Sequence, residues 1–253
     1  MEYIPAKSIV NRTKNSSWFG TEYNMNIYRG CCHGCIYCDS RSDCYHNEDF
    51  DRVKAKADAL RIIRDDLASK VKIGVVGTGA MSDPYNPFEE ELLLTRRALT
   101  LLEAYGFGVA IATKSDLITR DIDVLTSIHR TMPAICKITV TTCDDELAAK
   151  VEPRAPSPSR RLSAVERLSA AGLFTGILMM PILPFLEDSP ENIQTVVDRA
   201  ADAGARFVYP ALGMTCRAGQ REYFYQKLEA QFPGRGLADR YQRRYGPRYK
   251  CAS

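Results

Sequence analysis

The sequence predicts an α/β protein, a partial (β/α)6 barrel of the TIM type. Short apolar or β-branched runs alternate with longer segments of helical character, and this pair of elements repeats six times along the 253 residues. Such alternation implies a parallel sheet with helices packed outside it. The length and the hydrophobic content of 45% suffice for one large core. An open doubly wound sheet fits the same pattern, and in both architectures ligands gather at the carboxyl ends of the strands.

Six strands are expected. The first is a short apolar segment that ends just before Gly30, and the second is a compact β-branched run. The others follow at the spacing that the alternation gives. The expected strands cover residues 25–28, 72–76, 108–113, 134–141, 174–180 and 206–211.

Six helices alternate with these strands. The first has apolar residues at helical spacing, and the second begins with an acidic turn, which a helix N-terminus favours. Gly172 and Gly204 close two later helices. The expected helices cover residues 51–69, 89–105, 121–130, 157–171, 190–203 and 220–232.

No linker divides the chain. Residues 1–23 are expected to form an irregular lead-in, residues 24–212 the (β/α)6 core, and residues 213–253 a C-terminal helix with a basic tail rich in arginine and tyrosine. The longest apolar stretch, 177–185, contains two prolines and is too short to span a membrane. The N-terminus lacks the apolar core of a secretory signal, so a cytoplasmic location is expected. Nine cysteines in an intracellular chain of this length favour metal or redox chemistry over a disulfide framework.

The charge is unevenly distributed. The formal net charge is +3, but residues 235–253 contain six cations and one anion, so this tail carries +5 and the remainder −2. Tyr241, Tyr245 and Tyr249 are interleaved with these cations. The pattern predicts either a surface for nucleic acid, with phosphate contacts and base stacking, or a solvated basic helix whose tyrosines pack on the domain.

The strongest chemical signal is the run Cys-Cys-His-Gly-Cys-Ile-Tyr-Cys that ends at Cys38. Cys31, Cys35 and Cys38 have the spacing C-x3-C-x2-C and follow the first expected strand. Thiolates suit iron–sulfur clusters, and a cube of four irons held by three regular ligands has one iron open. A structural zinc site usually takes four ligands, and the chain has no second C-x2-C pair to complete one. A redox C-x2-C pair would leave Cys31 unexplained, so the spacing favours the cluster.

This run resembles the signature of the radical S-adenosylmethionine (SAM) enzymes, C-x3-C-x-aromatic-C, with Tyr37 at the aromatic position. The stretches 28–38 and 82–89, with shorter matches at 113–116 and 152–157, are similar to the branch that includes spore photoproduct lyase and proteins labelled DNA repair photolyases. The resemblance covers about residues 11–211. Related proteins continue further, so the chain is expected to be part of a longer one.

The resemblance implies the radical SAM form of the partial barrel and two cofactors. A [4Fe–4S] cluster would be held by Cys31, Cys35 and Cys38, and SAM would bind its open iron. One electron from the cluster would cleave SAM, and the resulting 5′-deoxyadenosyl radical would take a hydrogen atom from the substrate. The cofactors supply the difficult chemistry, while the protein positions them and excludes water.

Residues near the ends of the expected strands are candidates to hold SAM. The resemblance implies that Lys114 pairs with the carboxylate of SAM. Ser82 and Asp83 would meet its ammonium, or form a turn or helix cap. The other candidates are Glu152 for the ribose hydroxyls or simply as a pair with Arg154, Arg154 for the carboxylate or a substrate phosphate, Met180 for the adenine or the core, and Tyr37 over the cluster.

The loop 77–82 lacks the hydrogen-donating cysteine that spore photoproduct lyase has there, so another substrate is expected. Cys143, at the end of the fourth expected strand, is the candidate hydrogen-atom donor. Three functions stay open: a radical enzyme that repairs or modifies nucleic acid, contacting it through residues 235–250; a radical enzyme acting on a peptide or partner protein; and a non-enzymatic iron–sulfur or zinc module. The enzymes would need a reducing electron-transfer protein.

Overall fold

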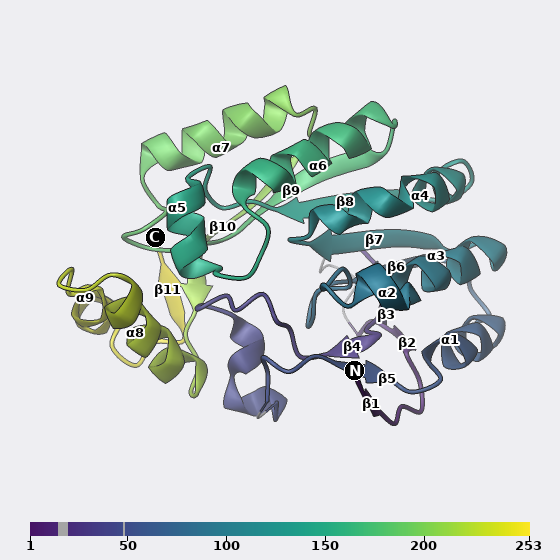
Figure 1. Cartoon of the computed structure of the whole chain (residues 1–253), viewed down its shortest axis with the longest axis horizontal. Helices are drawn as coiled ribbons and strands as arrows, with labels where there is room; N and C mark the ends of the chain where they lie inside the picture. Colours follow the sequence, from purple (N-terminus) through teal and green to yellow (C-terminus); the bar gives the residue numbers. More distant parts are fainter. Residues whose placement is uncertain (15–19, 48) are drawn as a thin grey trace.

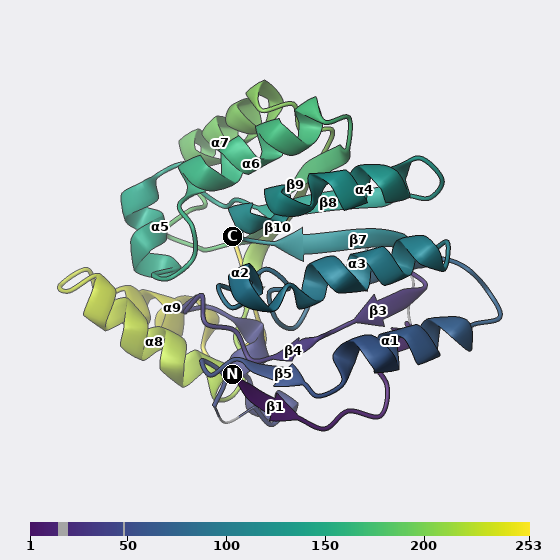
Figure 2. The same cartoon turned by 45° about the vertical axis from the view of Figure 1, so that its right-hand side comes forward.

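Eight strands form one twisted sheet through the molecule, with helices along its outer side (Figures 1 and 2). The structure is a computed structural model, and it describes residues 1–14, 20–47 and 49–253. Across the sheet the strands follow the order β2 (Val10–Arg12), β3 (Tyr23–Met25), β6 (Val75–Thr78), β7 (Gly108–Thr113), β8 (Ala134–Thr139), β9 (Phe174–Ile182), β10 (Val208–Thr215) and β11 (Lys250–Ala252).

The neighbouring strands β3 and β6 to β10 are all parallel, whereas β2 and β11 are antiparallel at the two edges. Helical structure follows each parallel strand, as the (β/α)6 prediction requires. In the part of the chain that the structure describes, the edge strands β2 and β11 do not pair with each other. The sheet is therefore an open, partial barrel, and the predicted fold class is confirmed.

Nine α-helices and three short 3-10 helices are present among the described residues. The first seven α-helices accompany the parallel strands, while the last two form a separate pair beside β11 (Figure 1). The α-helices are α1 (Ala59–Ala68), α2 (Glu89–Leu92), α3 (Leu94–Ala104), α4 (Ile122–His129), α5 (Asp145–Val151), α6 (Pro158–Ala170), α7 (Pro190–Asp202), α8 (Gln220–Gln231) and α9 (Leu237–Tyr245). The 3-10 helices are η1 (Asp39–Arg41), η2 (Asp43–Tyr45) and η3 (Asp116–Asp121).

Local sequence explains where α6 and α7 begin. Ser157 and Ser189 precede them, and each serine side chain accepts a hydrogen bond from a backbone N–H of the first turn. A proline follows each serine, at a position where a helix needs no backbone donor. The helices then bury one apolar face each against the sheet.

Several expected boundaries differ from the structure. The lead-in is not irregular, because it contains β2 and also β1 (Glu2–Ile4), which joins β5 (Lys54–Lys56) and β4 (Tyr28–Arg29) in a second, three-stranded sheet. The first helix begins at Ala59 rather than at residue 51. Residues 53–56 alternate between buried and partly exposed positions, which is the period of a strand.

Two other differences concern helices. The expected helix 89–105 is interrupted at Leu93, whose φ of 52° lies in the left-handed region. Helix α5, strand β11 and, within the basic tail, helix α9 were not expected as separate elements. The tail is therefore ordered structure packed on the domain.

Two buried apolar clusters result. The larger lies between the sheet and helices of its outer side. The second joins α8, α9 and β11 to the cysteine loop, the segment 31–38, and contains Cys35, Ile36 and Tyr37. The cysteine loop is thus supported by the C-terminal helices from behind, while the ends of the parallel strands lie beside it.

Candidate active site

The three predicted ligands face one cavity. Cys31, Cys35 and Cys38 all line a cavity of about 210 Å³ at the carboxyl ends of the parallel strands. Burial raises the pKa of each thiol, to about 12 for Cys31. The electrostatic influence of the thiols on one another adds to this effect. A bound metal centre would reverse it, because metal binding displaces the thiol protons.

The donor set fits a cluster better than a single ion. Among the described residues, no group of three or more histidine, cysteine or acidic side chains converges on one ion position. A mononuclear zinc site requires such convergence. In an iron–sulfur cube each thiolate binds a different iron, so three thiols that share a cavity without meeting at one point suit a cube.

Four further predicted residues line the same cavity: Ser82, Asp83, Lys114 and Met180. They come from the loops after β6 and β7 and from the end of β9. Thr113, Thr139 and the glycine Gly79, which sequence reasoning did not single out, line it too. Gly79 has a φ of +96°, and a Cβ there would lie 1.8 Å from the carbonyl oxygen of Ala112, so only glycine fits this crossing of β7.

Asp83 connects the loops around the cavity. Its Oδ1 accepts hydrogen bonds from the hydroxyl of Thr113 (2.6 Å) and the N–H of Tyr85 (2.9 Å), and its Oδ2 accepts the N–H of Lys114 (2.8 Å). His33 Nδ1 lies 3.5 Å from Oδ2. Burial lowers the pKa of His33. The bond to Tyr85 is the turn role that the sequence allowed for Asp83.

Lys114 presents an ammonium group to the cavity. Its Nζ lies 3.7 Å from Oε1 of Glu152. Burial lowers the pKa of Lys114, but the nearby Cys35 and Glu152 raise it more, and the net shift is upward. Tyr37 donates its hydroxyl proton to the same carboxylate oxygen. Glu152 therefore contacts both Lys114 and Tyr37, but neither Glu152 nor Tyr37 lines the cavity.

The second oxygen of Glu152 pairs with Arg161 of α6 at 2.5 Å. Although burial alone would raise the pKa of Glu152, Arg161 and Lys114 lower it, and the net shift is downward. The expected alternative, a pair between Glu152 and Arg154, is wrong. Arg161 was missed because only the fold shows that its side chain points inward; it is 1% exposed.

Arg154 donates hydrogen bonds to the backbone of the cysteine loop. Its backbone N–H donates to the carbonyl of His33 (3.0 Å) and its Nε to the carbonyl of Cys32 (2.7 Å), while Nη2 bonds Asp51 (2.8 Å). Gly34, with a φ of +73°, makes room, since a Cβ there would lie 3.2 Å from the guanidinium. Arg154 does not line the cavity of the thiols.

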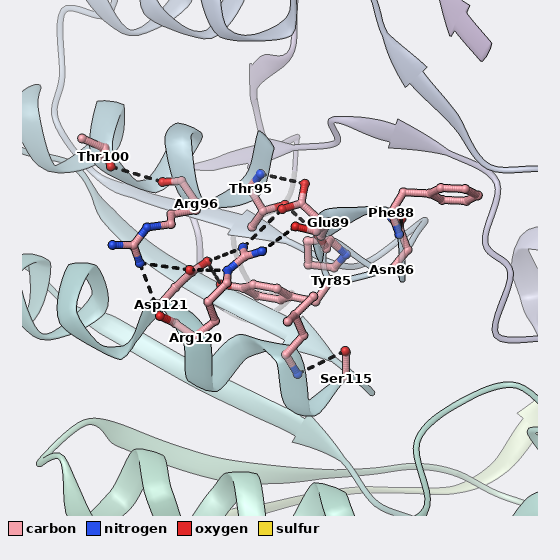
Figure 3. Close-up of polar contacts among 12 residues, drawn as sticks. Tyr85, Asn86, Phe88, Glu89, Thr95, Arg96, Thr100, Ser115, Arg120 and Asp121 are labelled. Atoms are coloured by element: carbon pink, nitrogen blue, oxygen red, sulfur yellow. Dashed lines mark hydrogen bonds and ion pairs between the residues drawn. The ribbon is translucent and has the colours of Figure 1, made fainter. Parts of the chain in front are cut away.

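A second buried network is centred on Glu89 and lies at the start of the segment that carries the cysteine loop (Figure 3). Glu89 accepts the hydroxyl of Tyr28 and the N–H of Thr95 (2.8 Å), and it pairs with Arg120 at 3.3 Å. Arg120 also pairs with Asp121 at 2.8 Å. Glu89, the last residue of the stretch 82–89 on which the resemblance rests, thus has a structural role.

Cys143 is not brought to the cavity. Its thiol faces the carbonyl oxygen of Thr195 in α7, at 3.9 Å, and packs against the larger apolar cluster. The chain turns outward after β8, where Asp144 caps α5. The geometry therefore does not support Cys143 as the hydrogen-atom donor. Among the described residues, the cavity has no cysteine beyond the three of the loop.

An open parallel sheet with three thiols and an ammonium group at the carboxyl ends of its strands is an arrangement typical of an iron–sulfur enzyme. The family model of the Radical SAM superfamily matches residues 25–208, and the chain belongs to this superfamily. Its members are enzymes that use a [4Fe–4S] cluster and SAM.

Relatives and solved structures agree with this assignment. An uncharacterised protein of Mycobacterium tuberculosis is 30% identical over 249 residues, which are 96% of this chain and 72% of that protein. An uncharacterised protein of Methanocaldococcus jannaschii is 29% identical over 190 residues, 73% of this chain and 68% of that protein.

The fold is similar to that of a mutant spore photoproduct lyase, with a TM-score of 0.67 and 14% identity over 92% of this chain and 66% of the lyase. It is also similar to the methyltransferase TsrM of Kitasatospora setae, with a TM-score of 0.53 and 12% identity over 90% of this chain and 37% of that one. The chain thus spans just under two thirds of the lyase, and at such identities the likeness shows the fold alone. Within the described residues, no helix has the length and apolar character needed to cross a bilayer.

Proposed function

We propose that Cys31, Cys35 and Cys38 hold the [4Fe–4S] cluster and that the adjoining cavity receives SAM. The observation that carries this proposal is the shared cavity: three thiols and the ammonium of Lys114 line it together. When bound, the cluster and SAM supply reductive cleavage of SAM and the radical that takes a hydrogen atom from the substrate. The protein's own residues orient these groups and keep water out.

Lys114 is the proposed partner of the SAM carboxylate. Its raised pKa keeps it cationic at neutral pH, and Glu152 limits its side chain to the cavity wall. Asp83 is proposed to act by positioning, because both its oxygens already accept bonds from the neighbouring loops. Ser82 donates to the carbonyl of Tyr28 at 3.0 Å, which ties the loop after β6 to the start of the cysteine loop. Met180 provides an apolar wall for the adenine.

The proposed substrate is nucleic acid, in the cytoplasm. One structural relative is a spore photoproduct lyase with bound AdoMet and dinucleoside spore photoproduct. In this chain a second cavity, of about 580 Å³, adjoins the first at His33, which lines both. Four arginines line it, namely Arg120, Arg154, Arg160 and Arg167. Three of the four already pair with carboxylates, and Arg167 is outside the ion pairs found among the described residues. Guanidinium groups are suited to phosphate oxygens, so this cavity offers a place for a nucleotide backbone beside the SAM cavity, with Arg167 as its uncompensated cation.

The test is anaerobic reconstitution with iron and sulfide, followed by dithionite, SAM and a panel of oligonucleotides, intact and ultraviolet-irradiated. We expect bound iron and acid-labile sulfide, release of 5′-deoxyadenosine and methionine, and faster release with an oligonucleotide substrate. Cys31→Ser should abolish release. Cys44→Ser, at an exposed cysteine outside the cavity, is the matched control and should retain it.

The cofactor assignment would be contradicted if reconstituted wild-type protein contained neither iron nor acid-labile sulfide. Full turnover by Cys31→Ser would contradict it as well. Release that no oligonucleotide accelerates would contradict the substrate assignment alone.

A further inference from the structure

The tail carries a surface of uncompensated positive charge. Its cations are all exposed, and none joins a carboxylate in the ion pairs found among the described residues. Several exposed arginines elsewhere have acidic partners, as Arg61 has Asp58 and Arg160 has Asp116, whereas in the tail all six cations lack one in these ion pairs. We call this surface the basic face, and it consists of Arg235, Arg240, Arg243, Arg244, Arg248 and Lys250.

Two of the three tyrosines of the tail are not available to stack on bases. Tyr241 is fully buried and donates its hydroxyl proton to the carbonyl of Pro184 (2.8 Å). Tyr245 is 6% exposed. The ring of Tyr249 lies under the guanidinium of Arg217 at 4.7 Å. The second sequence interpretation, a basic helix whose tyrosines pack on the domain, therefore describes Tyr241 and Tyr245.

The basic face lies behind the cysteine loop and not at the cavity. Helix α8 touches the loop directly, because Gln220 donates from Nε2 to the carbonyl of Tyr37 at 2.7 Å. Both views show α8 and α9 on the same side of the molecule, next to the segment that carries the loop (Figures 1 and 2). No described residue beyond Met180 lines the cavity of the thiols. A molecule bound to the basic face would leave the cavity free.

Aromatic side chains fill the space between the basic face and the loop. The ring of Tyr241 meets that of Phe224 at 5.1 Å and that of Phe185 at 5.2 Å, both edge-on. Arg240 of the basic face covers the outer side of Phe185, at 4.4 Å. Phe224 and Tyr241 belong to the same buried cluster as Cys35 and Tyr37. The basic face and Cys35, a proposed ligand of the iron–sulfur cluster, thus lie on one buried apolar cluster, through which an electron could pass.

We infer that the basic face docks an acidic electron-transfer protein and that the electron reaches the cysteine loop through the aromatic layer of α8 and α9. The inference rests on the proposed function, because a cluster held by the loop must be reduced from outside. The donor loses one electron and the cluster gains it, with no bond formed or broken. Opposite charge guides such encounters and sets their dependence on salt.

A substrate fits this location less well than a reductant. A substrate must place an atom in the cavity, whereas the basic face adjoins the loop from the other side. Single-stranded nucleic acid usually combines phosphate contacts with stacking on aromatic rings, and two of the three tyrosines here are buried. An acidic protein needs only the cations.

The experiment compares two reductants on reconstituted protein: dithionite, and an acidic flavodoxin kept reduced by its reductase. The double variant Arg243→Glu/Arg244→Glu changes the charge of the basic face. Arg97→Glu/Arg130→Glu makes the same change at two exposed arginines outside the observed ion pairs, one in the first turn of α3 and one directly after α4. Readouts are the rate of cluster reduction from its visible absorbance, the affinities for flavodoxin and for an oligonucleotide by titration, and release of 5′-deoxyadenosine.

We expect the Arg243/Arg244 variant to lower flavodoxin affinity and the flavodoxin-driven reduction rate at low salt by about tenfold or more, with dithionite reduction unchanged. The Arg97/Arg130 variant should match wild type with both reductants, and added salt should slow only the flavodoxin reaction. Equal flavodoxin rates in both variants would overturn the inference. So would loss of oligonucleotide binding with normal flavodoxin reduction, which would assign the face to nucleic acid. Failure of wild type with dithionite as well would instead refute the proposed function.

Discussion

Two buried carboxylates hold the two ends of the segment that carries the cysteine loop, and they do so with the same set of side chains. Each carboxylate accepts a tyrosine hydroxyl from that segment and pairs with an arginine from a helical element on the outer side of the sheet. We call them the Glu89 triad (Tyr28, Glu89 and Arg120) and the Glu152 triad (Tyr37, Glu152 and Arg161).

The triads differ in what surrounds the carboxylate. Glu152 has a second cation, Lys114, and its pKa is lowered despite complete burial. Glu89 has only Arg120, which it shares with Asp121, and burial raises its pKa. The Glu89 triad anchors the start of the segment, and none of its three residues lines the thiol cavity. The Glu152 triad anchors its end and, through Lys114, places a positive charge in that cavity.

The difference shows how one structural device acquires a functional role. An Arg–Glu–Tyr contact satisfies a buried carboxylate and fixes a loop. In the Glu152 triad the carboxylate also pairs with Lys114, directly after β7. The same contact therefore fixes the position of a positive charge that lines the thiol cavity. The two triads can therefore be separated by experiment, because one should affect activity and the other mainly stability.

The largest expected effect is on catalysis. Lys114→Met should lower SAM cleavage with dithionite by about 100-fold, because loss of a buried charged contact costs about 2–5 kcal/mol and each 1.4 kcal/mol corresponds to about tenfold. Arg120→Met, the matched change in the Glu89 triad, should leave the rate measured without oligonucleotide within about threefold per folded molecule, because Arg120 lines the second cavity and not that of the thiols. 5′-Deoxyadenosine release, normalised to bound iron, measures both. Comparable losses in the two variants would show that the triads do not divide the roles in this way.

The next effect is on stability. Glu152→Gln leaves Lys114 and Arg161 without a carboxylate in a buried site, and removing one partner of a buried ion pair costs about 3–5 kcal/mol. Glu89→Gln should cost less, about 1–3 kcal/mol, because Arg120 retains Asp121 and because burial, which raises the pKa of Glu89, disfavours the charged form that the substitution removes. Denaturant unfolding of the two variants at pH 7 gives the comparison. A larger loss for Glu89→Gln would reverse the ranking.

Part of this arrangement could be predicted from sequence. In a parallel sheet the carboxyl ends of all strands meet at one edge, so residues just after strands gather there whatever the details of packing. That argument placed Ser82, Asp83, Lys114 and Met180 beside the cysteines. It failed for Cys143, because the chain has already turned into the cap of α5 there and the side chain points to α7.

Other features depend on contacts that no local pattern encodes. Arg161 lies on a helix whose sequence does not reveal which arginine turns inward, and its partner Glu152 is known only from the fold. By contrast, the spacing of Leu237, Tyr241 and Tyr245 is that of one helix face, and all three are buried. The periodicity was therefore present in the sequence of the tail, and it favours the second of the two interpretations given there, a basic helix whose tyrosines pack on the domain.

The smallest and most specific effect is on the pH dependence of stability, where the triads should have opposite signs. The pKa of Glu89 is raised above the ordinary 4.5, so from that pH up to the raised pKa the folded protein binds more protons than the unfolded chain, and its stability falls as pH rises. The pKa of Glu152 is lowered below 4.5, so the unfolded chain binds more protons between the lowered pKa and 4.5, and stability falls as pH drops.

Each carboxylate contributes a slope of up to about 1.4 kcal/mol per pH unit within its own window. In wild type, Glu89 makes stability fall as the pH rises above 4.5, and Glu89→Gln should lack this fall. Glu152 makes stability fall as the pH drops below 4.5, and Glu152→Gln should lack that one. Thermal unfolding between pH 3.5 and 8, with the exposed Glu91→Gln of the same helix α2 as control, measures both differences. Slopes of the same sign in the two variants would mean that Lys114 does not distinguish the triads electrostatically, and the placement of its charge in the cavity would lose its physical basis.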